Sequence, residues 1–175
     1  MRSSIYSFAV PFVLCLALCP LPEALAKTPL AQIGENKVKL EVAQTQAQIE
    51  RGLMFRSSMP EDQGMVFLFH PPRKVRFWMF NCLMSLDMLF IKDGKIVKIS
   101  HDVPPCKSHN REECPLYPEE GQIEASEVLE LNAGYCQRHA VKEGDSISFS
   151  FPGVEKSSSS KKKSSEKAEL GEPAK

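Results

Sequence analysis

Alternation between apolar and polar residues predicts a chain rich in β-structure. Val38, Leu40 and Val42 alternate with charged residues, which is the period-two pattern of a half-buried strand. Residues 64–69 (GMVFLF) form a continuous apolar run that is too short for a normal helix, so it indicates a central strand. Further extended segments are expected at 75–79, 86–92, 95–100, 127–131 and 146–151.

Turn and cap residues predict how these segments connect. Asp93-Gly94 between two apolar runs is a strong hairpin signal, because both residues tolerate positive φ. Thr45 followed by Gln48 fits a capping box and predicts a short helix that ends near Arg56. A second short helix is expected near 135–140. These elements predict an α+β domain, mainly antiparallel β in a compact sheet or barrel-like arrangement, with two short helices.

The first residues have the layout of a signal peptide. A positive start at Met1-Arg2 is followed by an apolar run at 5–19 and by the small-residue triplet that ends at Ala26. The run is shorter than the roughly 20 residues that span a bilayer, so cleavage is expected after Ala26, with a retained anchor as the alternative. The mature protein is then exported, periplasmic or secreted, without a transmembrane span.

Composition divides the remaining chain. Residues 27–36 are expected to be a short extension, 37–154 a single folded domain, and 155–175 a disordered tail rich in serine, lysine and glutamate. Lysine plus arginine and aspartate plus glutamate both total 22, which disfavours a nucleic-acid partner. A monomer without cofactor is expected. The basic tail leaves open an envelope-structural role in which it tethers the domain to a polyanion.

Four of the six cysteines lie beyond the expected cleavage site, and they predict disulfides. We favour Cys106–Cys114, which would staple the proline-rich, irregular segment 102–122, with Cys82–Cys136 as the second pair. The alternative is a zinc site made of Cys106, His109, Cys114 and Cys136, although its spacing is unlike that of structural zinc sites.

Three blocks of sequence carry a resemblance to a known family. They are ERGLMFR at 50–56 with DQGMVF at 62–67; FWM at 77–79 with Asn81, Leu86-Asp87 and Phe90-Ile91; and VLELNAG at 128–134 with VKEGD at 141–145. The chain resembles the uncharacterised bacterial and archaeal domain of unknown function number one hundred and ninety-two. This resemblance implies a compact, mainly β domain and no demonstrated activity. The family often has threonine where this chain has Cys82, which suggests a partner for this thiol.

The aromatic segment near Trp78 supplies the candidate binding surface. An extended chain cannot bury both faces of 77–81 unless something covers each, so a pocket is one interpretation and plain core packing is the other. The candidate surface consists of Arg51, Met54, Trp78, Met79, Asn81 and Asp87. If a pocket exists, a pair between Arg51 and Asp87 is expected to hold it open or to bind a small anion.

No catalytic motif is recognisable in the sequence. We therefore expect a small non-catalytic binding or accessory module of the envelope, whose partner is a small ligand or an envelope protein. The alternative is a small hydrolase-like enzyme that uses Asp87 with a histidine such as His101.

Overall fold

The computed structural model describes residues 28–152. The expected signal peptide, its cleavage site after Ala26 and the expected tail at 155–175 lie outside the described residues. Within residues 28–152, no helix is both long and apolar enough to cross a membrane.

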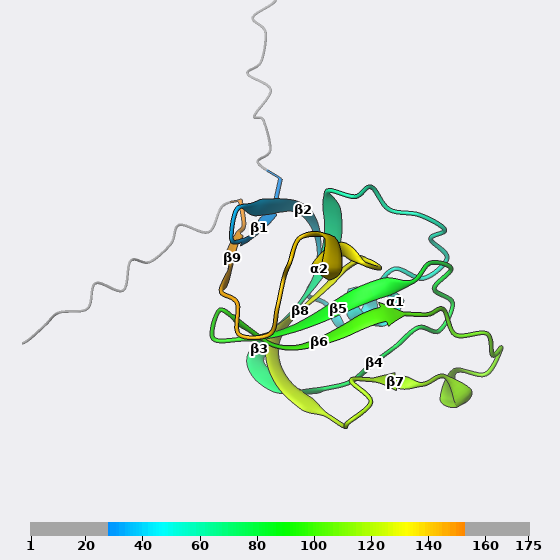
Figure 1. Cartoon of the computed structure of the whole chain (residues 1–175). Helices are drawn as coiled ribbons and strands as arrows, with labels where there is room; N and C mark the ends of the chain where they lie inside the picture. The colour runs from blue at the N-terminus through cyan, green and yellow to red at the C-terminus, as the bar shows by residue number, and fades with distance from the viewer. Residues whose placement is uncertain (1–27, 153–175) are drawn as a thin grey trace, which may run out of the picture.

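Seven strands form one sheet in the order β6-β5-β8-β3-β2-β1-β9, and two short strands, β4 and β7, pair separately. The strands are β1 (Leu30–Ile33), β2 (Asn36–Ala43), β3 (Gln63–Val75), β4 (Phe77–Trp78), β5 (Leu86–Lys92), β6 (Lys95–Val103), β7 (Leu116–Tyr117), β8 (Ile123–Asn132) and β9 (Ile147–Ser150). The helices are α1 (Gln46–Arg51), the 3-10 turn η1 (Arg111–Glu113) and α2 (Tyr135–Arg138). In Figure 1, β1, β2 and β9 lie at one end of the molecule, and β4 and β7 lie at the other.

The sheet is curled into a half-barrel. All pairs within it are antiparallel except β2 and β3, which run parallel because α1 lies between them in the chain. The two outer strands approach each other at one corner, where Lys95 and Ser146 form an isolated bridge. There the Ile147 N–H donates to the Gly94 carbonyl at 2.9 Å. The predicted fold class, mainly antiparallel β with two short helices, is confirmed.

Side chains pack on both faces of the sheet. One core cluster contains Met65, Phe67, Met88, Phe90 and Val128. The other contains the intervening residues of the same strands: Val66, Leu89, Ile91, Leu129 and Leu131. Neighbouring residues of a strand point to opposite faces, so these two clusters show that β3, β5 and β8 are covered on both faces of the sheet. Apolar residues therefore follow one another in these strands instead of alternating with polar ones.

Several local predictions hold in the structure. Asp93 and Gly94 both have positive φ, 51° and 71°, in the turn between β5 and β6. Thr45 and Gln48 form the capping box of α1. The helix, however, ends at Arg51 rather than near Arg56, because Gly52 leaves the helical conformation at φ 44°.

The structure corrects the expected start of the fold. The sequence predicts a short extension at 27–36, yet Leu30–Ile33 form β1, which pairs with β2 on one side and β9 on the other. Ala31 and Ile33 are 0% and 2% exposed, so they belong to the core. Only two apolar residues of this short strand point inward, which is too brief a pattern to separate from a polar extension by sequence.

Candidate functional site

A hollow in the described domain lies between α1, β3 and the β4–β7 pair. Its cavity volume is about 680 Å³. Aromatic side chains form much of its wall, and they come from the two neighbouring segments β3 and 77–80: Phe67, Phe69, Phe77, Trp78 and Phe80. The ring centroids of Phe67 and Phe77 are 4.9 Å apart in an edge-to-face arrangement. The rings therefore support one another as a preformed apolar wall.

One carboxylic acid lies at the buried end of this cavity. Glu130 comes from the middle of β8 and is 3% exposed, and its Oε2 atom has no hydrogen-bond partner among the described residues. Leu129 and Leu131 belong to the core cluster on the opposite face of the sheet, so strand alternation turns Glu130 toward the cavity. Burial raises the pKa of Glu130 to about 8. At neutral pH this side chain is therefore mainly a neutral acid that can donate a hydrogen bond.

Cys82 is the second titratable group at the buried end of the cavity. It is 7% exposed, and burial, followed by the charge of Glu130, raises the pKa of its thiol to about 12. The thiol therefore stays protonated at neutral pH and has little nucleophilic character.

Cationic side chains surround the cavity. Five of its described lining residues carry positive charge: Arg51, Arg73, Lys74, Arg76 and Arg111. Apart from Glu130, the acidic residue among the described lining is Glu50. The cavity thus combines an apolar wall with a net positive rim.

Two of these arginines lie over aromatic rings. Arg73 lies 4.7 Å from the centroid of Phe69, and Arg111 lies 5.2 Å from the centroid of Trp78. Arg76 has a different role, because it donates hydrogen bonds to the backbone carbonyls of Pro118 and Leu116 at 3.2 and 3.1 Å. It fixes the segment that carries β7, whereas the guanidinium groups of Arg73 and Arg111 are held at the rim by stacking.

The predicted binding surface is only partly brought together. Arg51, Met54 and Trp78 line the cavity. Met79 is 1% exposed and belongs to the core. Asn81 has φ 57°, and its backbone carbonyl accepts a hydrogen bond from the Phe55 N–H at 2.7 Å. Neither of these two residues lines the cavity.

Asp87 lies on the other side of the sheet. Leu86 and Met88 pack in the same core cluster as Phe67, so the intervening Asp87 points to the opposite face. Its side chain is 0% exposed. The expected pair between Arg51 and Asp87 is not formed, because the sheet separates the two side chains.

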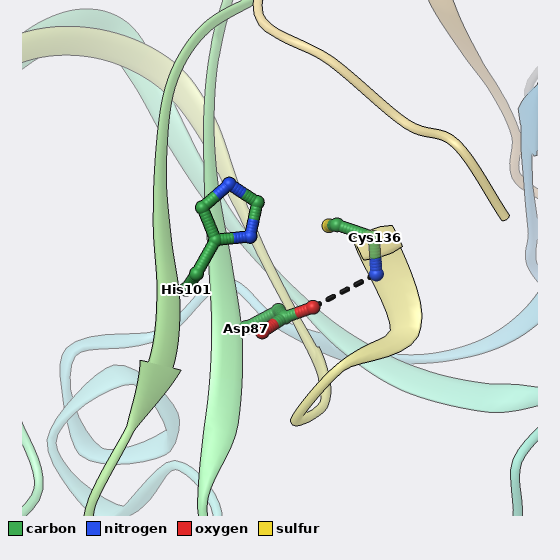
Figure 2. Close-up of side chains that lie close together, drawn as sticks. All are labelled: Asp87, His101 and Cys136. Carbon is green, nitrogen blue, oxygen red and sulfur yellow. Dashed lines mark hydrogen bonds between the residues drawn. The ribbon is translucent and has the colours of Figure 1, made fainter. Parts of the chain in front are cut away.

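Backbone N–H groups satisfy the Asp87 carboxylate. Its Oδ1 accepts hydrogen bonds from the N–H groups of Asp102 at 2.9 Å and Gly134 at 3.2 Å. Its Oδ2 accepts one from the N–H of Cys136 at 2.8 Å. Figure 2 shows this carboxylate between His101 of β6 and Cys136 of α2. Burial, followed by the charge of Asp87, raises the pKa of the Cys136 thiol.

The structure resolves the four cysteines as one bridge and two thiols. Cys106 and Cys114 are joined with a Cα–Cα distance of 5.6 Å, which is the favoured staple of the irregular segment. The second expected bridge is not formed: Cys82 and Cys136 are separate, buried thiols that belong to core clusters on opposite faces of the sheet. The alternative zinc set of Cys106, His109, Cys114 and Cys136 is also corrected, because the disulfide uses two of its sulfur atoms.

Glu130 is absent from the site predicted by the sequence. The one available signal was a carboxylate inside the apolar run VLEL at 128–131. An acidic residue at this place in a fully buried strand is unusual unless it is paired or functional. The run itself predicts a strand and carries part of the family resemblance, but alternation alone does not show that its carboxylate faces a cavity.

Comparison with known protein families identifies the family of this chain. Residues 29–149 match DUF192, described as an uncharacterized ACR. A crystal structure of a provisionally assigned transcription regulator from Sinorhizobium meliloti 1021 is 34% identical, with a TM-score of 0.58, over 69% of this chain and 91% of that chain. A protein of unknown function from Novosphingobium aromaticivorans is 28% identical, with a TM-score of 0.59, over 73% and 89%. Among curated proteins, no similar sequence is found. The chain therefore belongs to the DUF192 family.

Proposed function

We propose that this protein is a non-catalytic binding module that holds a small organic anion in the Glu130 cavity. The observation that carries the proposal is the unpartnered Glu130 carboxyl group at the buried end of a cavity with aromatic walls and a cationic rim. Leaving a buried polar group without a partner costs roughly 1 to 3 kcal/mol. Glu130 therefore weakens the empty fold, and a ligand that hydrogen-bonds to it would recover this cost.

The lining indicates the chemistry of the ligand. A volume of about 680 Å³ is typical of sites for small molecules. The aromatic walls favour a flat apolar body, and Arg73 and Arg111 favour a carboxylate, sulfonate or phosphate at the rim. Glu130, in its neutral form, favours a hydrogen-bond acceptor at the inner end of the ligand.

We place this module outside the cytoplasm. The signal-peptide layout of residues 1–26 supports export, and so does the Cys106–Cys114 disulfide, because such bridges persist in oxidising compartments. Native mass spectrometry of protein recovered from the exported fraction checks both points. The expected polypeptide starts at Lys27 and carries one disulfide, and a chain that retains residues 1–26 would contradict the proposal.

Anilinonaphthalene sulfonate, an aromatic anion, is a suitable probe for the cavity. Trp78 is the only tryptophan of the chain and lines the cavity, so its fluorescence reports binding directly. We expect saturable quenching with one probe per chain, and affinity at least about 5-fold weaker in Arg111→Ala and in Lys74→Ala. Lys37→Ala removes an exposed lysine on β2 that is not part of the lining, and it should bind like the wild type. Quenching that is absent, or equal in all these variants, would refute the proposal.

The hydrolase alternative has one supporting observation. The structure brings His101 close to Asp87, as an acid–base pair would require. Against it, the carboxylate oxygens of Asp87 already accept three backbone N–H groups, and Asp87 is 0% exposed. A screen of carboxylic and phosphate esters with the wild type and His101→Asn tests it. Turnover that the variant abolishes would favour the enzyme over the binding module.

A further inference from the structure

Three side chains with metal-binding atoms converge on the face of the sheet opposite the Glu130 cavity. They are Asp87 of β5, His101 of β6 and Cys136 of α2, and one ligand atom of each lies within 4.8 Å of those of the other two. Figure 2 shows that the three side chains come from separate elements and point toward a common centre. A carboxylate, an imidazole and a thiol at one point form a donor set that zinc prefers.

A β-bulge brings His101 into this group. Leu86 pairs with Val103 and Met88 with Ser100, so Asp87 alone faces two residues, His101 and Asp102. The extra residue is accommodated by Asp102, whose φ is 49°. Bulges redirect side chains locally, and here the result is that His101 lies beside Asp87 while remaining exposed to solvent.

Asp87 is held in position for a ligand role. Its three N–H donors come from Asp102, Gly134 and Cys136 and fix the orientation of the carboxylate. Oδ2 accepts only one of these bonds, which leaves it a second lone pair. Outer hydrogen bonds of this kind typically orient the carboxylates that bind metals.

The cluster also has a negative charge without a cationic partner. The ion pairs among residues 28–152 include neither Asp87 nor the adjacent Asp102. Both carboxylates raise the pKa of the Cys136 thiol, after the larger effect of burial. A bound cation reverses this influence, because it stabilises the thiolate directly.

We propose that Asp87, His101 and Cys136 bind one Zn²⁺ ion, with water as the fourth ligand on the exposed side next to His101. Zinc bonds of about 2.0 to 2.3 Å place tetrahedral donor atoms roughly 3.3 to 3.8 Å apart, so the three groups need to move inward by about 1 Å at most. On binding, the Cys136 thiol loses its proton to solvent and its sulfur forms the bond to zinc. Mg²⁺ and Ca²⁺ do not fit this site, because they take oxygen ligands. This site is independent of the proposed ligand cavity.

Cobalt(II) is the probe for this site, since it occupies zinc sites and gives a sulfur-to-cobalt charge-transfer band. The full-length mature protein is titrated without reductant, which preserves the Cys106–Cys114 bridge. We expect a band that saturates at one cobalt per chain, that Zn²⁺ abolishes by competition, and that Cys136→Ser lacks. His101→Asn should weaken binding by about 10-fold or more.

Two control variants separate this site from the other metal-binding side chains. Cys82→Ser removes the other free thiol, and His109→Asn removes an exposed histidine of the irregular segment, so both should keep the wild-type band. Asp87 is left unchanged because its loss endangers folding. Absence of the band in the folded wild type would overturn the proposal, as would its persistence in Cys136→Ser or an unchanged affinity in His101→Asn.

Discussion

Replacing Glu130 by glutamine keeps the shape of this buried side chain and removes its ability to ionise. In the folded protein, burial raises the pKa of Glu130 from 4.5 to about 8. The folded state therefore binds more protons than the unfolded state between these two values. The wild type therefore loses stability as pH rises from about 4.5 to about 8. Glu130→Gln lacks the ionisable group and so lacks this contribution to the loss.

The size of this effect follows from the shift. One pKa unit corresponds to about 1.4 kcal/mol, so the wild type should lose roughly 3 to 4 kcal/mol between about pH 5 and about pH 8 through this group. The glutamine amide also lacks partners in the empty cavity, at a cost of roughly 1 to 3 kcal/mol, but this cost does not depend on pH. The informative quantity is thus the difference in the free energy of unfolding between the variant and the wild type, followed as a function of pH.

Urea unfolding at several pH values measures this difference. The difference in the free energy of unfolding should move in favour of Glu130→Gln by roughly 3 to 4 kcal/mol from about pH 5 to about pH 8. Glu35→Gln, at an exposed turn, is the control and should leave the pH profile of the wild type unchanged. A difference between Glu130→Gln and the wild type that is constant with pH to within about 1 kcal/mol would refute the reasoning, because Glu130 would then be ionised in the fold.

Three further changes test the framework around the two sites. In the wild type, three backbone N–H groups share the two oxygens of the Asp87 carboxylate, whereas Asp87→Asn leaves them only one acceptor oxygen. This variant should therefore lower the free energy of unfolding, measured in urea, by about 3 kcal/mol or more. A loss below about 1 kcal/mol would contradict the assigned hydrogen bonds. Replacing Cys106 and Cys114 together by serine should lower the free energy of unfolding by about 2.5 kcal/mol, because the loop entropy of the unfolded chain increases. The double variant should also be cleaved faster by proteases within 104–122. An unchanged cleavage rate would argue against a disulfide that staples this segment. Gly64→Ala should lower the free energy of unfolding by about 1 to 3 kcal/mol, because the new Cβ would lie 2.8 Å from the backbone carbonyl oxygen of Glu130. Thermal unfolding measures this loss, and an unaltered midpoint temperature would be inconsistent with this packing.

The sequence by itself determined the local features whose physical causes lie within a few residues. The turn at Asp93-Gly94 needs two residues that tolerate positive φ, and the α1 cap needs Thr45 and Gln48 three positions apart. The disulfide between Cys106 and Cys114 closes a segment of sequence separation 8, so chain proximity alone favoured it. The fold class followed from the number and spacing of apolar runs.

Only the tertiary structure decided which residues share a site. Glu130 faces a cavity because α1 and the β4–β7 pair lie beside one face of the sheet, and alternation in sequence cannot tell what covers each face. For the same reason, the sequence predicted one binding surface that contains both Asp87 and Arg51, although the sheet separates the two side chains. Asp87 instead meets His101 and Cys136, because a bulge in β6 and the pairing of β5 with β8 join segments that lie far apart in the chain. Strand register depends on long-range packing, and a change of one residue moves every side chain to the opposite face.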